Sequence, residues 1–146
     1  MEIQKFNNLL SQMGVIGHKV ANNSIEIDTV YIMGSIEFDA FYYNVFFRTE
    51  NKLFRVNKLE CNIKNYQINY DNIFALFDEG IKVLKEIKEL LEKENQQVPT
   101  LIKLYFYPKQ LKLNTTYEYL IQYSEDDELM PDDLLERWFE EESQIN

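Results

Sequence analysis

The chain has 146 residues, and its 25 acidic side chains outnumber its 15 lysines and arginines, which gives a formal net charge of −10. Because 45% of the residues are hydrophobic and 14% aromatic, a disordered acidic polypeptide is excluded and a single folded domain, 1–146, is predicted. The negative charge also argues against nucleic-acid and anionic-membrane partners, since both attract positive surfaces.

The first predicted element is an amphipathic helix over residues 2–13. Its apolar residues fall at helical spacing, and Gly14 followed by Gly17 is expected to end it. After Asn22 and Asn23, residues 24–33 alternate in the manner of a strand, which Gly34 and Ser35 should terminate.

A run rich in aromatic and β-branched residues extends from Glu37 to residue 49. It is apolar on both faces, so we expect a central strand that is covered on at least one side. Residues 52–56 should pair with it as a hairpin across Glu50 and Asn51.

From about Asp71 to Asn95 the apolar residues recur at the spacing of a helix. Asp71 is the expected N-terminal cap, and Pro99 excludes any continuation. The predicted core-facing stripe consists of Phe74, Phe77, Ile81, Leu84, Ile87 and Leu91.

Two more strands are predicted at 100–107 and 111–123, followed by a helix that begins at Pro131. The apolar stripe of this last helix is Leu134, Leu135, Trp138 and Phe139. The fold class is therefore α+β, an antiparallel sheet with packed helices in the order α-β-β-β-α-β-β-α.

The sequence offers little for catalysis. His18 is the only histidine and is interpreted as a surface or turn residue, and Cys61 as a small half-buried packing residue. No Gly-x-Ser-x-Gly elbow or phosphate-binding glycine loop is present, and the acids of 126–133 lack the spacing of a calcium loop. We therefore expect a protein that is not an enzyme and has no cofactor or metal.

One cysteine cannot form an internal disulfide, which favours a reducing compartment. The first residues lack the basic start and apolar run of a signal peptide, and no stretch of about 18 apolar residues occurs. A cytoplasmic location without a membrane span is expected.

Strand tyrosines have two interpretations. We favour a packing role, because aromatic residues fill pleated surfaces well. Outward-facing tyrosines could also form a recognition patch. The residues concerned are Tyr42, Tyr43, Tyr105, Tyr107, Tyr117, Tyr119 and Tyr123.

The acidity is concentrated in the C-terminal segment 125–142, where ten carboxylates and Arg137 give a local charge of −9. A solubilising surface would explain this, and so would a binding site for a basic partner. Acids at 140–142 oppose the dipole of the last helix and so lower its stability. This cost favours the binding role, because a basic partner would compensate for it. The candidate contact residues are Glu125, Asp126, Asp127, Glu128, Asp132, Asp133, Glu136 and Glu140.

Residues 70–140 contain a long helix, DNIFALFDEGIKVLKEIKELLEKENQQ, then PTLIKLYFYPKQLKLNTTYEY and the acidic SEDDELMPDDLLERW. In these stretches the chain resembles the YezG-like family of bacterial antitoxin or immunity proteins. The resemblance implies a small acidic α+β protein that neutralises a secreted nuclease toxin.

The leading hypothesis is a cytoplasmic, non-enzymatic immunity protein that binds a basic toxin domain and blocks its active site or substrate groove. Carboxylates would occupy the basic surface that a nuclease uses for phosphates. One alternative is an adaptor or structural module whose acidic end only maintains solubility. Another is a small ligand-binding domain or enzyme built around an apolar pocket.

Overall fold

The computed structural model describes residues 2–145, and its elements follow the predicted order with two short additions. The additions are a 3-10 turn, η1, and a one-turn helix, α2. The elements are α1 (Ile3–Lys19), β1 (Thr29–Glu37), β2 (Ala40–Thr49), β3 (Lys52–Arg55), η1 (Val56–Lys58), α2 (Leu59–Asn62), α3 (Tyr70–Lys93), β4 (Leu101–Tyr107), β5 (Lys112–Glu118) and α4 (Pro131–Ser143). The α+β class and the order α-β-β-β-α-β-β-α are confirmed.

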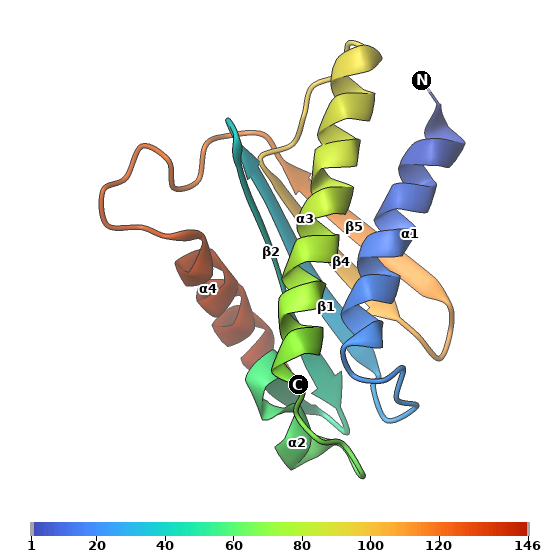
Figure 1. The fold of residues 1–146 in the computed structure, drawn as a ribbon. Helices are drawn as coiled ribbons and strands as arrows, with labels where there is room; N and C mark the ends of the chain where they lie inside the picture. Colours follow the sequence, from blue (N-terminus) through green and yellow to red (C-terminus); the bar gives the residue numbers. More distant parts are fainter. Residues whose placement is uncertain (1, 146) are drawn as a thin grey trace.

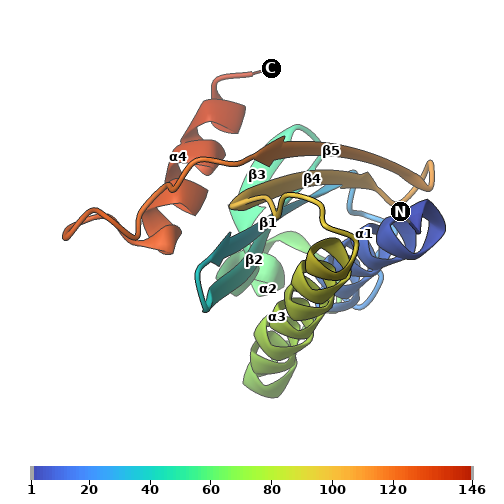
Figure 2. The ribbon, with the colours of Figure 1, turned by 90° about the horizontal axis from the view of Figure 1, so that it is seen from above.

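The five strands form one antiparallel sheet in the order β3-β2-β1-β4-β5. Helices α1 and α3 lie side by side on one face, and α4 packs on the other (Figure 1; Figure 2). Alternate residues of β1 serve the two faces, with Ile32 in the core under α1 and α3, and Tyr31 and Met33 in the smaller core under α4. Within residues 2–145, none of the helices has the length and apolarity needed to cross a bilayer.

The expected end of the first helix is wrong, because α1 continues through both glycines to Lys19. A Cβ atom at Gly17 would lie 2.9 Å from Val30 Cγ1, and one at Gly14 would lie 3.1 Å from the Phe106 ring. The two glycines therefore bring α1 close to the sheet and do not stop the helix.

The first strand also lies later than predicted, at Thr29–Glu37, with Gly34 and Ser35 inside it. Ile25 is 85% exposed and belongs to the turns that precede the strand. Gly34 is needed within the sheet because a Cβ atom there would lie 2.7 Å from Leu84 Cδ2 of α3.

The hairpin of β2 and β3 is confirmed, and Glu50 and Asn51 both have the positive φ angles, 48° and 65°, that a tight two-residue turn requires. The middle strand of the sheet is β1, while β2 lies beside it. Residues Phe38 and Asp39 form the β1–β2 turn, so β2 begins at Ala40 and not at Glu37.

Helix α3 is confirmed, but two details of its prediction are wrong. Its cap is Asn69, whose Oδ1 accepts hydrogen bonds from the backbone N–H groups of Asp71 and Asn72. Phe74 is 63% exposed, because the buried stripe is rotated away from it. That stripe comprises Ile73, Leu76, Gly80, Val83, Leu84, Ile87, Leu90 and Leu91.

The last predicted strand is too long, since β5 ends at Glu118 and the chain then leaves the sheet. The final helix starts at Pro131 as predicted. From its expected stripe Leu135 and Trp138 are buried, and Leu134 and Phe139 are partly buried against the same core.

Replacing Leu84 with alanine should lower the free energy of unfolding by about 2–5 kcal/mol, because Leu84 is fully buried and packs on Gly34. Phe74→Ala on the same helix is the matched control, and we expect it to cost less than about 1 kcal/mol. Urea denaturation measures both. Equal losses in the two variants would contradict this orientation of α3.

Candidate functional site

The only histidine and the only cysteine, the side chains best suited to acid–base or nucleophilic chemistry, lie on different helices. His18 is in the last turn of α1, not in a turn between elements, and its Nε2 lies 2.8 Å from the carbonyl oxygen of Ser24. Cys61 is exposed on α2 and so is not the half-buried packing residue that we expected. No cluster of three potential metal ligands occurs within residues 2–145.

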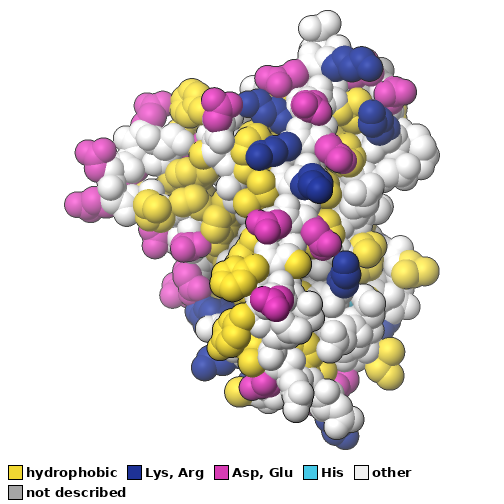
Figure 3. All heavy atoms as spheres, in the orientation of Figure 1, with side chains coloured by type: hydrophobic (Ala, Val, Ile, Leu, Met, Phe, Trp, Pro, Cys, Tyr) yellow, Lys and Arg dark blue, Asp and Glu magenta, His cyan; other side chains and the backbone are white. Residues whose placement is uncertain are grey.

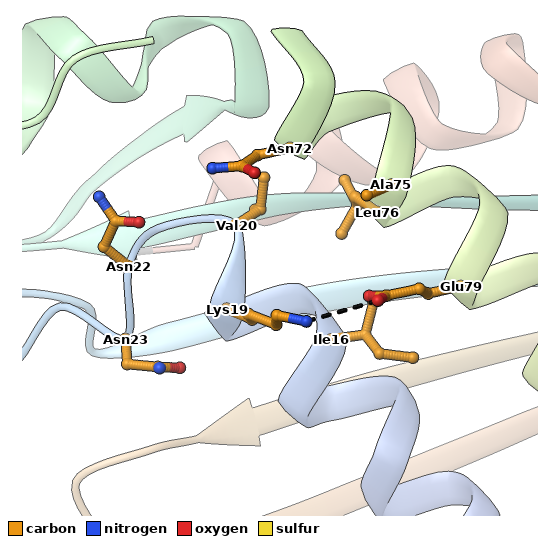
Figure 4. Close-up of a pocket in the computed structure, with 9 residues that line it drawn as sticks. All are labelled: Ile16, Lys19, Val20, Asn22, Asn23, Asn72, Ala75, Leu76 and Glu79. Carbon is orange, nitrogen blue, oxygen red and sulfur yellow. Dashed lines mark hydrogen bonds and ion pairs between the residues drawn. The ribbon is translucent and has the colours of Figure 1, made fainter. Parts of the chain in front are cut away.

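A hollow of about 320 Å³ lies between the end of α1 and the first half of α3 (Figure 4). Lys19 Nζ reaches across it to Glu79 Oε1 at 3.4 Å, and asparagines and aliphatic side chains form the rest of the wall. Its described lining includes neither a hydroxyl or thiol nucleophile nor a histidine. The polar groups that line the hollow are the Lys19–Glu79 pair and the side-chain amides of Asn22, Asn23 and Asn72.

The acidic segment is positioned by a buried glutamate that sequence reasoning missed. Glu37, only 2% exposed at the end of β1, accepts hydrogen bonds from the backbone N–H groups of Gln122 at 2.7 Å, Tyr123 at 3.4 Å and Ser124 at 2.9 Å. Burial alone would raise the pKa of Glu37, but the hydrogen bonds from Ser124, Gln122 and Tyr123 outweigh it and hold the pKa below its ordinary value. The carboxylate therefore fixes the chain where it leaves β5.

Tyr123 completes this anchor. Its side chain is buried, and its hydroxyl accepts a hydrogen bond of 2.9 Å from Ser35 Oγ of β1. The only sequence signal for the anchor is that Glu37 continues the face of Tyr31, Met33 and Ser35, where an apolar residue would otherwise be expected.

Two of the predicted contact acids also stabilise the backbone conformation of the acidic segment itself. Asp126 Oδ1 accepts hydrogen bonds from the N–H groups of Glu128 at 2.9 Å and Leu129 at 3.1 Å. Asp133 Oδ2 accepts one from the N–H of Met130 at 2.8 Å, which satisfies a donor ahead of the first turn of α4. Both carboxylates remain exposed, so they order the backbone and still present negative charge.

Glu136 is held by Arg55 of β3 through two hydrogen bonds, Nε to Oε1 at 2.8 Å and Nη2 to Oε2 at 2.5 Å. The bonds to Arg55 hold the pKa of Glu136 below its ordinary value. The Arg55 guanidinium also lies 4.0 Å above the Phe139 ring, which ties α4 to the edge of the sheet.

Among the acids at the end of α4, Glu142 is compensated within the fold. An Arg48 Nη2 group donates to the backbone oxygen of Glu142 at 3.2 Å, and a cation at a helix C-terminus is favourable. The Glu142 carboxylate accepts from the Tyr105 hydroxyl at 2.9 Å, and burial together with this carboxylate raises the pKa of Tyr105 to about 12. The negative charge at the end of α4 therefore costs less than the sequence suggested and gives weaker support for a binding role.

The structure divides the eight predicted contact residues into two groups. Four lie in the loop before α4, the orange loop that projects from the body in Figure 1, and four lie on α4. All are exposed except Glu136, which is half-buried. On α4, a spacing of four places Asp132, Glu136 and Glu140 along one face of the helix, with Asp133 beside them.

Most strand tyrosines are packing residues. Tyr43 is buried and donates to the backbone oxygen of Met13 at 2.6 Å, while Tyr42, Tyr105, Tyr107 and Tyr117 are partly buried. Tyr119 is exposed but lies beyond the end of β5. A continuous recognition patch of sheet tyrosines is not formed.

The chain matches no protein-family model, and no curated protein matches it either.

Replacing Glu37 with glutamine should destabilise the protein by about 1–3 kcal/mol at neutral pH, because the charged acceptor of three backbone N–H groups is lost. The folded-state pKa lies below the ordinary value of 4.5, so this stability is present above pH 4.5 and is lost as the pH falls through the folded pKa. The difference from wild type should shrink accordingly in urea denaturation at acid pH.

Glu118→Gln, on the exposed end of β5, provides the control and should leave stability nearly unchanged. A Glu37 variant as stable as this control at neutral pH would show that the anchor contributes nothing.

Proposed function

We propose that this protein is an immunity protein, or antitoxin, that binds a basic toxin domain, most simply a nuclease, and covers its active site or substrate groove. The observation that carries the proposal is that seven of the eight predicted contact carboxylates are exposed on a loop and helix whose backbone is held by internal hydrogen bonds. A surface that is only solubilising does not require such a fixed arrangement.

Fixed carboxylates would bind a nuclease through the lysines and arginines that it uses for phosphates. Complementary charge mainly accelerates association, and the accelerating effect falls with ionic strength. Because the loop is already ordered, little conformational entropy is lost when the partner binds.

Aromatic side chains beside the acids would add apolar contacts. Tyr70 of α3, which lines a hollow together with Asp132 and Glu136, is 63% exposed, whereas Trp138 is unavailable because it is buried between α4 and the sheet. Exposed aromatic residues that become buried in a complex slow its dissociation.

The protein would act in the cytoplasm and without catalysis. His18 is occupied by its contact with Ser24, and Cys61 stands alone on α2. A double variant, His18→Ala with Cys61→Ala, should therefore protect cells as well as wild type, as measured by growth during toxin expression. Loss of protection by a variant that melts like wild type would instead favour an enzyme.

Where a gene next to this chain's gene encodes a large protein with a basic C-terminal domain, that domain is the toxin probe, expressed with the chain and scored by growth. Charge reversal of Glu125, Asp127 and Glu128 to lysine should abolish rescue and lower the association rate by about tenfold or more. The carboxylates of these three residues have no described hydrogen-bond or ion-pair partner within residues 2–145, so stability should be unaffected.

Reversal of Glu86, Glu89 and Glu92 on exposed positions of α3 changes the net charge equally and is the matched control. It should leave rescue intact, and higher salt should slow wild-type association more than that of the loop variant. If both triple variants bind the domain like wild type, the acidic segment is not the binding site.

A further inference from the structure

A hollow of about 380 Å³, which we call the α3–α4 hollow, lies where α3, α4 and η1 meet. Both cores of the molecule contribute to its lining: Val56, Ile73 and Phe77 come from the core under α1 and α3, and Leu135 from the smaller core under α4. Hydrophobic side chains gather in the region between α3 and α4 in Figure 3. The volume is near the lower end of the range for binding pockets, about 300–1000 Å³, and suits one large side chain of a partner.

Both walls of the α3–α4 hollow are held in place within the free protein. Ile73 and Leu135 are 8% and 7% exposed, so packing fixes each side chain and only its outer surface faces the hollow. Arg55 ties α4 to the edge of the sheet through Glu136 and the ring of Phe139, which fixes the second wall. A partner would therefore lose little affinity to the ordering of these walls.

The polar groups at the base of the hollow have partners within the chain. The N–H of Val45, a residue of the lining, donates to the side-chain oxygen of Asn44 at 2.8 Å. Within residues 2–145, every buried side-chain nitrogen or oxygen has a hydrogen-bond partner. An apolar side chain can therefore enter the hollow without separating a buried polar group from its partner.

The rim of the hollow combines an aromatic ring with a negative charge. Tyr70 of α3 is 63% exposed, and Asp132 of α4 is exposed on the opposite side. Asp132 has no ion-pair partner within residues 2–145, whereas Glu136 is paired with Arg55. Burial raises the pKa of Tyr42 and the neighbouring Asp132 raises it further, so this hydroxyl stays neutral and leaves the charge of Asp132 in place. The rim is therefore complementary to a cation.

We propose that the α3–α4 hollow receives one aromatic or branched aliphatic side chain of the basic partner, next to a lysine or arginine that pairs with Asp132. The identity of the partner rests on the proposed function, whereas the preference for an apolar group beside a cation rests on the geometry of the hollow. A second copy of this chain is disfavoured as the occupant, because each copy carries −10. An apolar anchor of this kind would mainly slow the dissociation of the complex.

The first probe is 2-phenylethylguanidinium, which carries a phenyl ring next to a cation. Added to the 15N-labelled chain, it should shift the amide resonances of Asn57, Ile73 and Leu135, which line the hollow. Guanidinium chloride supplies the charge without the ring, and 3-phenylpropionate supplies the ring with the opposite charge, so neither should cause these shifts at the same concentration. Absence of the shifts with the first probe, or equal shifts with 3-phenylpropionate, would overturn the proposed occupant.

Tyr70→Ala and Phe74→Ala form a matched pair, because both side chains are 63% exposed on α3 and Tyr70 is the one that lines the hollow. Tyr70→Ala should bind 2-phenylethylguanidinium about threefold more weakly than Phe74→Ala. Asp132→Asn and Glu140→Gln form a second pair, since both acids are exposed on α4 and Asp132 is the one at the hollow. Asp132→Asn should again bind about threefold more weakly than its control. Equal affinities within either pair would overturn the proposal.

The second probe is the basic domain used to test the proposed function. If that domain binds wild type, it should bind Tyr70→Ala about tenfold more weakly than Phe74→Ala, chiefly through faster dissociation. Equal binding by the two variants would reject the hollow as its contact while leaving the immunity function in place. A domain that fails to bind wild type would reject the immunity function, and the result with 2-phenylethylguanidinium would then decide the hollow by itself.

Discussion

The carboxylate of Glu37 accepts hydrogen bonds from three consecutive backbone N–H groups, and the course of the chain after β5 depends on these bonds. They direct the chain from the far edge of the sheet to the face that α4 covers. Without that crossing, Tyr31, Met33 and Phe46 would be exposed, since Trp138 and Leu135 complete their core. A charged group on an apolar face thus allows the second core to form, because its hydrogen bonds compensate for its burial.

The carboxylates of the C-terminal segment have different physical tasks, although they look alike in the sequence. Asp126 and Asp133 bind backbone N–H groups, Glu136 joins α4 to Arg55, and Glu142 meets Tyr105. Glu125, Asp127 and Glu128 make no such contacts in the described structure. The internal bonds keep mutually repelling charges at fixed positions, where a partner encounters them together.

The sequence predicted those elements whose pattern is local. The period of α3, the Glu50-Asn51 hairpin and the start of α4 at Pro131 all follow from neighbouring residues. The predicted ends of α1 and β1 were wrong because they were placed at Gly14, Gly17 and Gly34. These glycines are required by contacts with residues distant in the chain. A glycine selected for close packing cannot be distinguished in one sequence from a glycine that ends an element.

For the candidate site, the sequence located the acidic residues but not their arrangement. The Glu37 anchor joins residues about 85 positions apart, and the Arg55–Glu136 pair joins residues 81 positions apart. Such features depend on the topology of the fold, which the pattern of hydrophobic and polar residues in one sequence specifies only weakly.

Trp138 gives the molecule an internal optical reporter. It is the only tryptophan, and it lies in the second core with its ring 5.7 Å from that of Tyr31 and its Nε1 3.4 Å from the Tyr105 hydroxyl. Its emission therefore senses whether α4 is seated on the sheet, while circular dichroism at helical wavelengths is dominated by the longer α1 and α3. Comparing the two signals during unfolding would distinguish release of α4 alone from collapse of the whole sheet.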